Sequence, residues 1–125
     1  MTYSTKIIRR HGLKLLRDAR KRGRRKHVVV DLSADDIMRL YEEQEGKCAL
    51  SGVPLMCGEE SIRQQRAMSL DRCIAGMGYE LGNVQLLTRA VNNAKSTMTS
   101  DEFIGMCCEV QKYNEAKRTV PETER

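Results

Sequence analysis

The sequence predicts an α+β fold, in which a basic N-terminal helix precedes a small strand-containing domain flanked by helices. Three observations predict it. Apolar residues recur at helical spacing near the N-terminus, short β-branched and alternating stretches fill the middle of the chain, and two capping-box patterns mark later helices. A length of 125 residues suits one small domain with an appended segment. We expect a basic helical arm and linker at 1–32, a main domain at 33–118 and a flexible tail at 119–125.

The N-terminal helix is predicted over residues 4–22. Its apolar stripe consists of Ile8, Leu15, Leu16 and Ala19. These positions recur at the spacing of a single helix face, which is typical of a helix with one buried side. Gly23 follows the stripe, and a glycine just past a helix readily takes the left-handed conformation. We therefore expect the helix to end at this glycine.

Short strands and helices alternate in the rest of the chain. The predicted elements are a strand or connector at 27–32, a helix at 34–45, a hairpin at 47–56, a polar loop at 57–66, a strand at 67–74, a glycine-rich loop at 75–83, a strand at 84–87, a helix at 88–97 and a last helix at 100–117. Ser33 with Asp36 matches a capping box, so the second helix is expected to begin after Ser33. Thr99 with Glu102 matches another, at the start of the last helix.

Basic residues are concentrated at the N-terminus. Residues 1–27 hold eleven Lys and Arg against one acid, Asp18, a net charge of +10, whereas the other 98 residues carry a net charge of −5. An acidic body needs no basic arm for solubility, so we expect the arm to bind a polyanion, with nucleic acid favoured over a solvated helix without a partner. The expected contacts in the arm are Arg9, Arg10, Lys14, Arg17, Arg20, Lys21, Arg22, Arg24, Arg25 and Lys26.

Membrane and secretory classes are not expected from this sequence. No apolar run approaches the ~18 residues of a membrane span, and the N-terminus lacks the apolar core of a signal peptide. We therefore expect a cytoplasmic protein, with its five cysteines reduced rather than paired in disulfides.

Polar residues mark a candidate catalytic site in the middle of the chain. Asp71 and Arg72 lie on the strand predicted at 67–74, and Asn92 lies on the helix that follows the next strand. This layout can bring Asp71 and Asn92 together, and one carboxylate with one amide suits a hard cation such as Mg²⁺ or Mn²⁺. A single metal beside a phosphodiester can stabilise the leaving oxygen during hydrolysis. The alternative interpretation is a surface ion pair between Asp71 and Arg72.

The stretches EEQEGKCALSGVPL, MSLDRCIAGMGYELGNVQLL and AVNNAKSTMTSDEF carry a family resemblance. Residues 35–105 resemble phage HNH-type nucleases of the ββα-metal (His-Me finger) superfamily, related to recombination endonuclease VII. The family pattern has Asp-His on the first strand, Asn before the second, and Asn or His on the helix with Lys three residues later. The positions on this pattern are Asp71, Asn83, Asn92 and Lys95.

The resemblance implies a ββα-metal unit within residues 33–118 and a phage-encoded protein acting in a bacterial cytoplasm. It also implies that Asp71 and Asn92 hold the metal and that Asn83 braces the loop. We expect Lys95 to lie at the surface and to contact phosphate. DNA is the expected partner.

The chain departs from the family pattern in its general base. Arg72 stands where the family has its histidine, and an arginine accepts no proton at neutral pH. The two histidines, His11 and His27, are expected to lie far away in the arm and linker. Arg72 is expected to clamp the scissile phosphate instead, with a metal-bound water or Tyr79 as the base.

The chain also departs from the family at its zinc knuckle. The two Cys-x-x-Cys motifs of the family correspond to Cys48-x-x-Ser51 and Thr88-x-x-Val91, so one ligand of four is left. Structural zinc needs four ligands, so we expect no structural zinc.

Three functions follow from these observations. The first is a metal-dependent DNA endonuclease or nickase whose catalytic residues are Asp71, Arg72, Asn83 and Asn92. The second, which the missing histidine favours, is a catalytically inactive DNA-binding or regulatory protein of the HNH fold. The third is a phage factor that binds RNA or protein through the arm.

Overall fold

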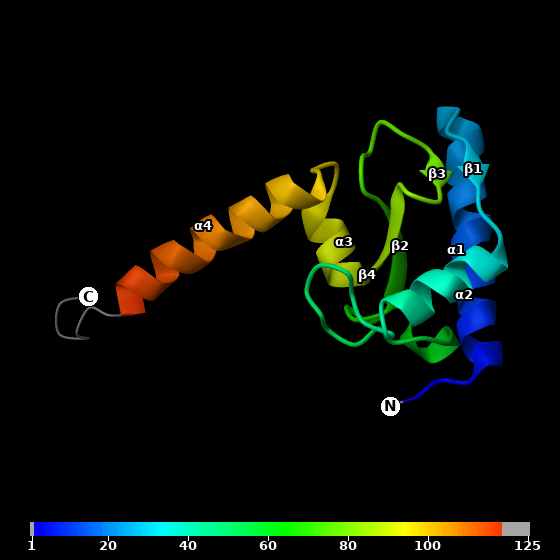
Figure 1. Cartoon of the computed structure of the whole chain (residues 1–125), viewed down its shortest axis with the longest axis horizontal. Helices are drawn as coiled ribbons and strands as arrows, with labels where there is room; N and C mark the ends of the chain where they lie inside the picture. The colour runs from blue at the N-terminus through cyan, green and yellow to red at the C-terminus, as the bar shows by residue number, and fades with distance from the viewer. Residues whose placement is uncertain (1, 119–125) are drawn as a thin grey trace.

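The computed structural model describes residues 2–118, which form four α-helices and two small sheets (Figure 1). The elements are α1 (Thr5–Lys26), β1 (Val30–Asp31), α2 (Ala34–Glu43), a 3-10 turn (Glu59–Ser61), β2 (Met68–Arg72), β3 (Tyr79–Glu80), β4 (Val84–Thr88), α3 (Arg89–Lys95) and α4 (Ser100–Arg118). The expected α+β class is confirmed. In the described range no helix has the length and apolar character needed to cross a membrane. The expected tail, 119–125, lies outside the described residues.

The first helix, α1, is longer than the sequence predicts. It begins after Ser4, whose hydroxyl accepts a hydrogen bond from the Ile7 amide at 3.2 Å, and ends at Lys26. Gly23 lies inside the helix. A glycine is needed there because the chain returns close to it, and a Cβ at this position would lie 2.5 Å from the Val28 carbonyl oxygen. The residue that adopts the left-handed conformation at the helix end is His27, with φ 56°.

The apolar face of α1 forms part of the main core. Ile8, Leu16 and Ala19 are buried in the same cluster as Leu86 and Leu87 of β4. The boundary expected between residues 32 and 33 also falls in buried chain, because Leu32 and Ala34 belong to this cluster. The structure therefore differs from the expected division into an arm and a main domain. The helix α1 packs into the core of the folded unit and is not a separate arm.

The second helix, α2, begins with the predicted capping box. The Asp36 amide donates to the Ser33 hydroxyl at 3.3 Å, and the Asp36 carboxylate accepts from the Ser33 amide at 2.9 Å. Ile37 packs against α1 so closely that a Cβ at Gly12 would lie 2.9 Å from its Cγ2 atom. The helix ends at Glu43, before the predicted limit at 45.

The strands β2 and β4 pair antiparallel, and α3 follows β4 without a loop. Their register places Asp71 opposite Gln85 and Arg72 opposite Val84. Figure 1 shows α3 beside this sheet, with α1 on its other side. The order strand, glycine-rich loop, strand and helix agrees with the predicted elements.

A second, parallel pair joins β1 to β3, with Val30 opposite Tyr79. The sequence predicts a loop at 75–83, whereas the structure has the short strand β3 within this range. It is held by backbone bonds such as Tyr79 N to Val29 O at 2.9 Å, and a two-residue strand has no side-chain periodicity by which to recognise it.

Candidate nucleic-acid interface

A cleft of about 400 Å³ lies between α1, β2 and α3. Its charged and amide-bearing walls include His11, Lys14, Asp18 and Arg22 from α1, Asp71 and Arg72 from β2, and Arg89, Asn92 and Asn93 from α3. The predicted Asp71, Arg72 and Asn92 therefore meet at one place, together with the helix that was expected to be an arm.

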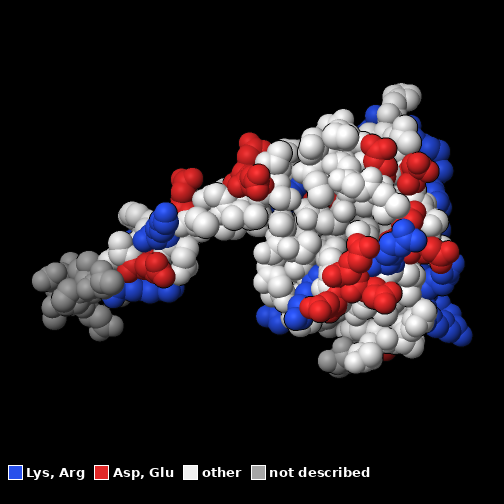
Figure 2. All heavy atoms as spheres, viewed as in Figure 1, with Lys and Arg blue, Asp and Glu red and all other residues white. Residues whose placement is uncertain are grey.

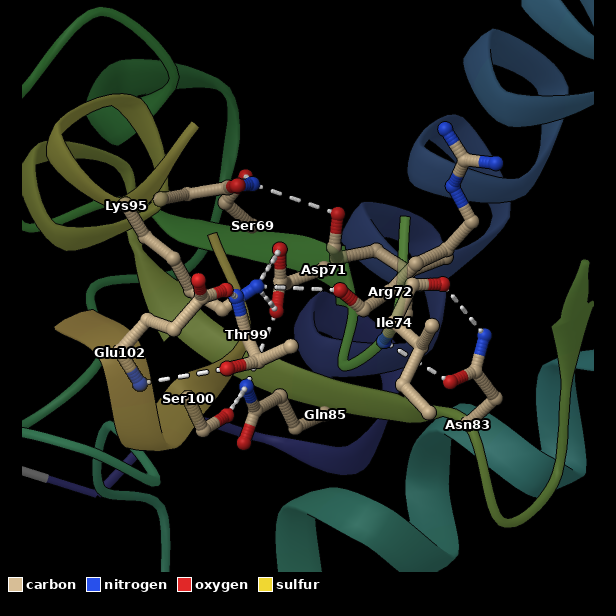
Figure 3. Close-up of polar contacts among 12 residues, drawn as sticks. Ser69, Asp71, Arg72, Ile74, Asn83, Gln85, Lys95, Thr99, Ser100 and Glu102 are labelled. Carbon is tan, nitrogen blue, oxygen red and sulfur yellow. Dashed lines mark hydrogen bonds and ion pairs between the residues drawn. The ribbon is translucent and has the colours of Figure 1, made fainter. Parts of the chain in front are cut away.

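Asp71 lies at the base of the cleft with both carboxylate oxygens in use. Gln85, its cross-strand neighbour, donates to Oδ2 at 2.9 Å. Lys95 of α3 places its ammonium 3.1 Å from Oδ2 and 3.3 Å from Oδ1 (Figure 3). Only 5 % of Asp71 is exposed, so this contact is a buried ion pair rather than a surface one.

Lys95 therefore does not meet the expectation of a phosphate contact. The residue is fully buried, and its ammonium also donates to the Arg72 carbonyl at 3.1 Å. The reason is helical geometry, because α3 packs on β2 and residues three apart share a helix face. Asn92 and Lys95 are both turned toward that strand.

Asn92 lines the cleft but makes no hydrogen bond to Asp71 in the structure. Its amide nitrogen donates to the Ser69 hydroxyl at 2.6 Å and to the Leu70 carbonyl at 3.3 Å. Asp71 and Asn92, the expected metal-binding pair, thus both line the cleft, but each side chain contacts other partners.

A divalent cation does not fit this arrangement. The one carboxylate at the base is neutralised by a buried ammonium, and a dication beside Lys95 would meet a like charge. Within residues 2–118, no cluster of three or more His, Cys, Asp or Glu side chains is placed to hold a metal. The Mg²⁺ or Mn²⁺ cofactor stays a prediction.

Tyr79 holds two guanidinium groups at the cleft. The Arg72 guanidinium lies over the Tyr79 ring, 5.0 Å from its centroid, and donates to the Met77 carbonyl at 3.1 Å. Arg22 of α1 donates to the Tyr79 hydroxyl at 3.3 Å. These contacts fix the direction of both side chains and leave most of their N–H donors available.

The cleft carries an excess of positive charge. Lys14 is paired with Asp18 at 2.8 Å, and Asp71 is paired with Lys95. Arg22, Arg72 and Arg89 form no ion pair with any carboxylate in the described part of the chain. Three guanidinium groups from three different elements are thus left to attract an anion.

Asn83 acts on the loop rather than in the cleft. Its side chain accepts from the Ile74 amide at 2.9 Å and donates to the carbonyls of Ile74, at 3.1 Å, and Gly78, at 2.9 Å (Figure 3). It therefore braces residues 74–83, the role that the family resemblance implies. Asn83 does not line the cleft itself, and its contacts hold the loop that carries Tyr79.

The expectation that His11 lies far from the site is wrong. His11 is buried in the wall of the cleft, where Nε2 lies 2.9 Å from the Met68 carbonyl and Nδ1 accepts from the Gly58 amide at 3.0 Å. Nε2 therefore carries the proton of a neutral ring. Both ring nitrogens are hydrogen-bonded, so the ring links α1 to β2 and has no free nitrogen that could act as a general base.

Burial lowers the pKa of His11 below its ordinary value of about 6.5, against the opposing effect of its bond to Met68. Protonation is then more favourable in the unfolded chain. The free energy of unfolding should be largest above pH 6.5 and should fall as the pH drops below 6.5 toward the folded pKa.

Chemical denaturation between pH 7.5 and 5 measures this dependence. In His11→Gln the starting stability should be lower and the fall over this range should be smaller than in the wild type. An equally steep fall in the variant would assign the dependence to another group.

The outer face of α1 carries the other expected contacts. Arg9 is paired with Asp35 at 2.7 Å, and Arg20 donates to the Leu32 carbonyl at 3.1 Å. The exposed members that form no ion pair within residues 2–118 are Arg10, Arg17, Lys21, Arg24, Arg25 and Lys26. Figure 2 shows blue side chains along the edge formed by α1.

Cys48 and Thr88, which match zinc-ligand positions of the nuclease family that the sequence resembles, lie together. Burial raises the pKa of the Cys48 thiol, but hydrogen bonds with Ser51, Thr88 and Leu50 outweigh it and bring the pKa below its ordinary value. Thr88 also caps α3, because its hydroxyl accepts from the Val91 amide at 3.4 Å. Hydrogen bonds thus join the two segments here, and the expected lack of zinc remains a prediction.

Sequence reasoning missed three contributors to the site. His11 carried a signal, since it lies three residues after Ile8 on the apolar stripe of α1. Gln85 and Arg89 have no recognisable sequence signal, because their positions at the site depend on the β2–β4 register and on the start of α3. Searches of protein-family models and of curated proteins found no match to this chain.

Proposed function

We propose that this protein binds DNA by its phosphate backbone, in the cleft between α1, β2 and α3 and along the outer face of α1. The observation that carries the proposal is the convergence of Arg22, Arg72 and Arg89 on one cleft without a carboxylate partner among the described residues. Guanidinium groups match the planar, paired oxygens of phosphate and bind them in a bidentate manner.

The chemistry of the cleft supports a phosphate ligand over an apolar one. Amide and hydroxyl side chains, among them Asn93, Ser96 and Thr97, line the wall beside the guanidinium groups. Most hydrogen bonds between proteins and DNA go to phosphate and sugar oxygens from such groups. The exposed cations of α1 extend the positive surface beyond the cleft, so a duplex has several phosphates to contact.

A DNA endonuclease or nickase of the HNH type is the second candidate. It is favoured by the meeting of Asp71, Arg72 and Asn92 in the same cleft, on a strand, strand and helix in the order that the family resemblance implies. Arg72 would hold the scissile phosphate. Asp71 would take part only after separating from Lys95, which is why binding is the better supported function.

Fluorescence anisotropy with a labelled duplex of about 20 base pairs tests the binding proposal. If about six phosphates are neutralised, log K should fall against log salt with a slope near −5. The triple variant Arg22→Gln, Arg72→Gln, Arg89→Gln should bind more weakly, and its slope should be smaller by about 3.

The control removes the same charge elsewhere, by Arg39→Gln, Lys47→Gln and Lys112→Gln, three exposed positions outside the cleft. Its slope should stay close to that of the wild type. Equal losses in the two variants would show that net charge, rather than the cleft, drives binding. Tighter binding to RNA than to the duplex would assign the partner to RNA.

A plasmid-nicking assay with Mg²⁺ or Mn²⁺ tests the second candidate. If the protein is a nuclease, the wild type should convert supercoiled plasmid to the nicked form, and the double variant Asp71→Asn, Lys95→Met should not. This variant removes the carboxylate and its buried counter-ion together, so loss of activity is separated from loss of folding. No cleavage of duplex, branched or single-stranded DNA by the wild type would rule out the nuclease and leave the binding proposal standing.

A further inference from the structure

The last helix, α4, projects from the body of the protein (Figure 1). The predicted Thr99–Glu102 capping box is present, with the Thr99 amide 2.9 Å from Oε1 of Glu102 and the Glu102 amide 3.2 Å from the Thr99 hydroxyl. Of the 19 residues of α4, Phe103 is the one that is buried. Most helical stability in proteins comes from packing of an apolar face. Within the described residues α4 has little such packing to stabilise it.

An apolar seam runs along α4, from the buried Phe103 onto the exposed part of the helix. Phe103, Met106, Val110 and Tyr113 follow one another at spacings of three, four and three residues. This is the spacing of the contact positions in paired helices. Val110 and Tyr113 are 57 % and 65 % exposed, and Met106 is 42 % exposed. A run of large apolar side chains on one face marks a protein contact rather than a solvated surface.

The charges of α4 point away from nucleic acid as the partner. The helix carries four acids and three bases, a net charge of −1, whereas α1 carries the basic charge of the chain. Two of its acids, Asp101 and Glu102, lie in the first turn, and two of its bases, Lys117 and Arg118, lie in the last. An antiparallel pair of α4 helices would set each acidic end beside a basic end, whereas a parallel pair would set like charges together.

We propose that α4 pairs antiparallel with α4 of a second copy of this chain. If Glu102 lies near Lys117 of the second copy, the midpoint between the two falls between residues 109 and 110, so Val110 would lie close to the two-fold axis. Met106 would then lie beside Tyr113 of the second copy, and Glu102 near Lys117 of the second copy. Such a two-fold contact uses the same surface on both copies.

Sedimentation velocity of the full chain over a concentration series tests the pairing. The seam is short, so we expect a dimer that dissociates on the order of 10 μM. Val110→Lys would place two like charges at the axis and should weaken the dimer more than about tenfold. Cys108→Lys adds the same charge on the opposite, exposed face of the helix and should leave it intact. A wild type that stays monomeric up to about 1 mM would overturn the proposal, as would a dimer that Val110→Lys leaves intact.

Disulfide cross-linking tests the orientation in a Cys107→Ser, Cys108→Ser background. A disulfide requires Cα atoms within about 7 Å. In the antiparallel pair, Met106→Cys alone should not cross-link, whereas a mixture of Met106→Cys and Tyr113→Cys chains should. Efficient cross-linking of Met106→Cys with itself would indicate a parallel pair and contradict the proposal.

Discussion

Lys95→Met should lower the free energy of unfolding by about 3–5 kcal/mol, the usual cost of removing one partner from a buried ion pair. Lys95 is fully buried, and Asp71, 5 % exposed, would keep its charge with Gln85 as the one remaining side-chain hydrogen-bond donor within residues 2–118. The lost ammonium also leaves the Arg72 carbonyl without its bond at 3.1 Å. Urea denaturation at pH 7 measures the effect.

The double variant Asp71→Asn, Lys95→Met is the matched control. It removes both charges, so it should be clearly more stable than Lys95→Met alone, because a neutral pair leaves no charge buried without a counter-charge. A double-mutant cycle then isolates the coupling between the two side chains. A single variant that loses less than about 1 kcal/mol would show that the carboxylate is hydrated or protonated and that the pair is not the base of the cleft.

Leu16→Ala should destabilise the protein by about 2–5 kcal/mol, the usual range for a leucine truncated in a core. Leu16 is 1 % exposed and lies where α1 joins the cluster that contains Leu86 and Leu87. The expected loss follows from α1 being a wall of the folded unit. Thermal or urea denaturation of the full chain measures it.

Leu13→Ala on the same helix is the control, because Leu13 is 39 % exposed. Its loss should stay within about 1 kcal/mol, since exposed substitutions have small effects. Equally small losses at both positions would show that α1 is a detachable arm. For the same reason, removing residues 1–26 is a poor test of DNA binding, because it would also remove part of the core.

Local patterns predicted the helices well. Ser33 with Asp36, and Thr99 with Glu102, are close in sequence, and both form the predicted capping boxes. The apolar stripe of α1 was also visible, because helical spacing is a property of the sequence alone. The prediction that α1 ends at Gly23 is wrong. This glycine instead allows a close approach of Val28, which depends on how the chain turns after α1.

The composition of the cleft was only partly predictable. The sequence pattern indicates Asp71, Arg72 and Asn92 as site residues, and the structure brings them to one cleft. The burial of Lys95 was not visible, because it requires the packing of α3 on β2. His11 was placed far away because its contacts, to Met68 and Gly58, are long-range in sequence.

The most direct test of DNA binding in the cleft is an NMR titration of the ¹⁵N-labelled protein with a short DNA duplex. Binding in the cleft predicts that the largest amide shifts occur at Lys14 and Arg22 of α1, Arg72 of β2 and Asn92 of α3, and that they weaken as salt is raised. The amides of α2, none of whose residues lines the cleft, should change little. Shifts confined to α2 or α4, or no shifts at a duplex concentration of about 1 mM in low salt, would contradict the account.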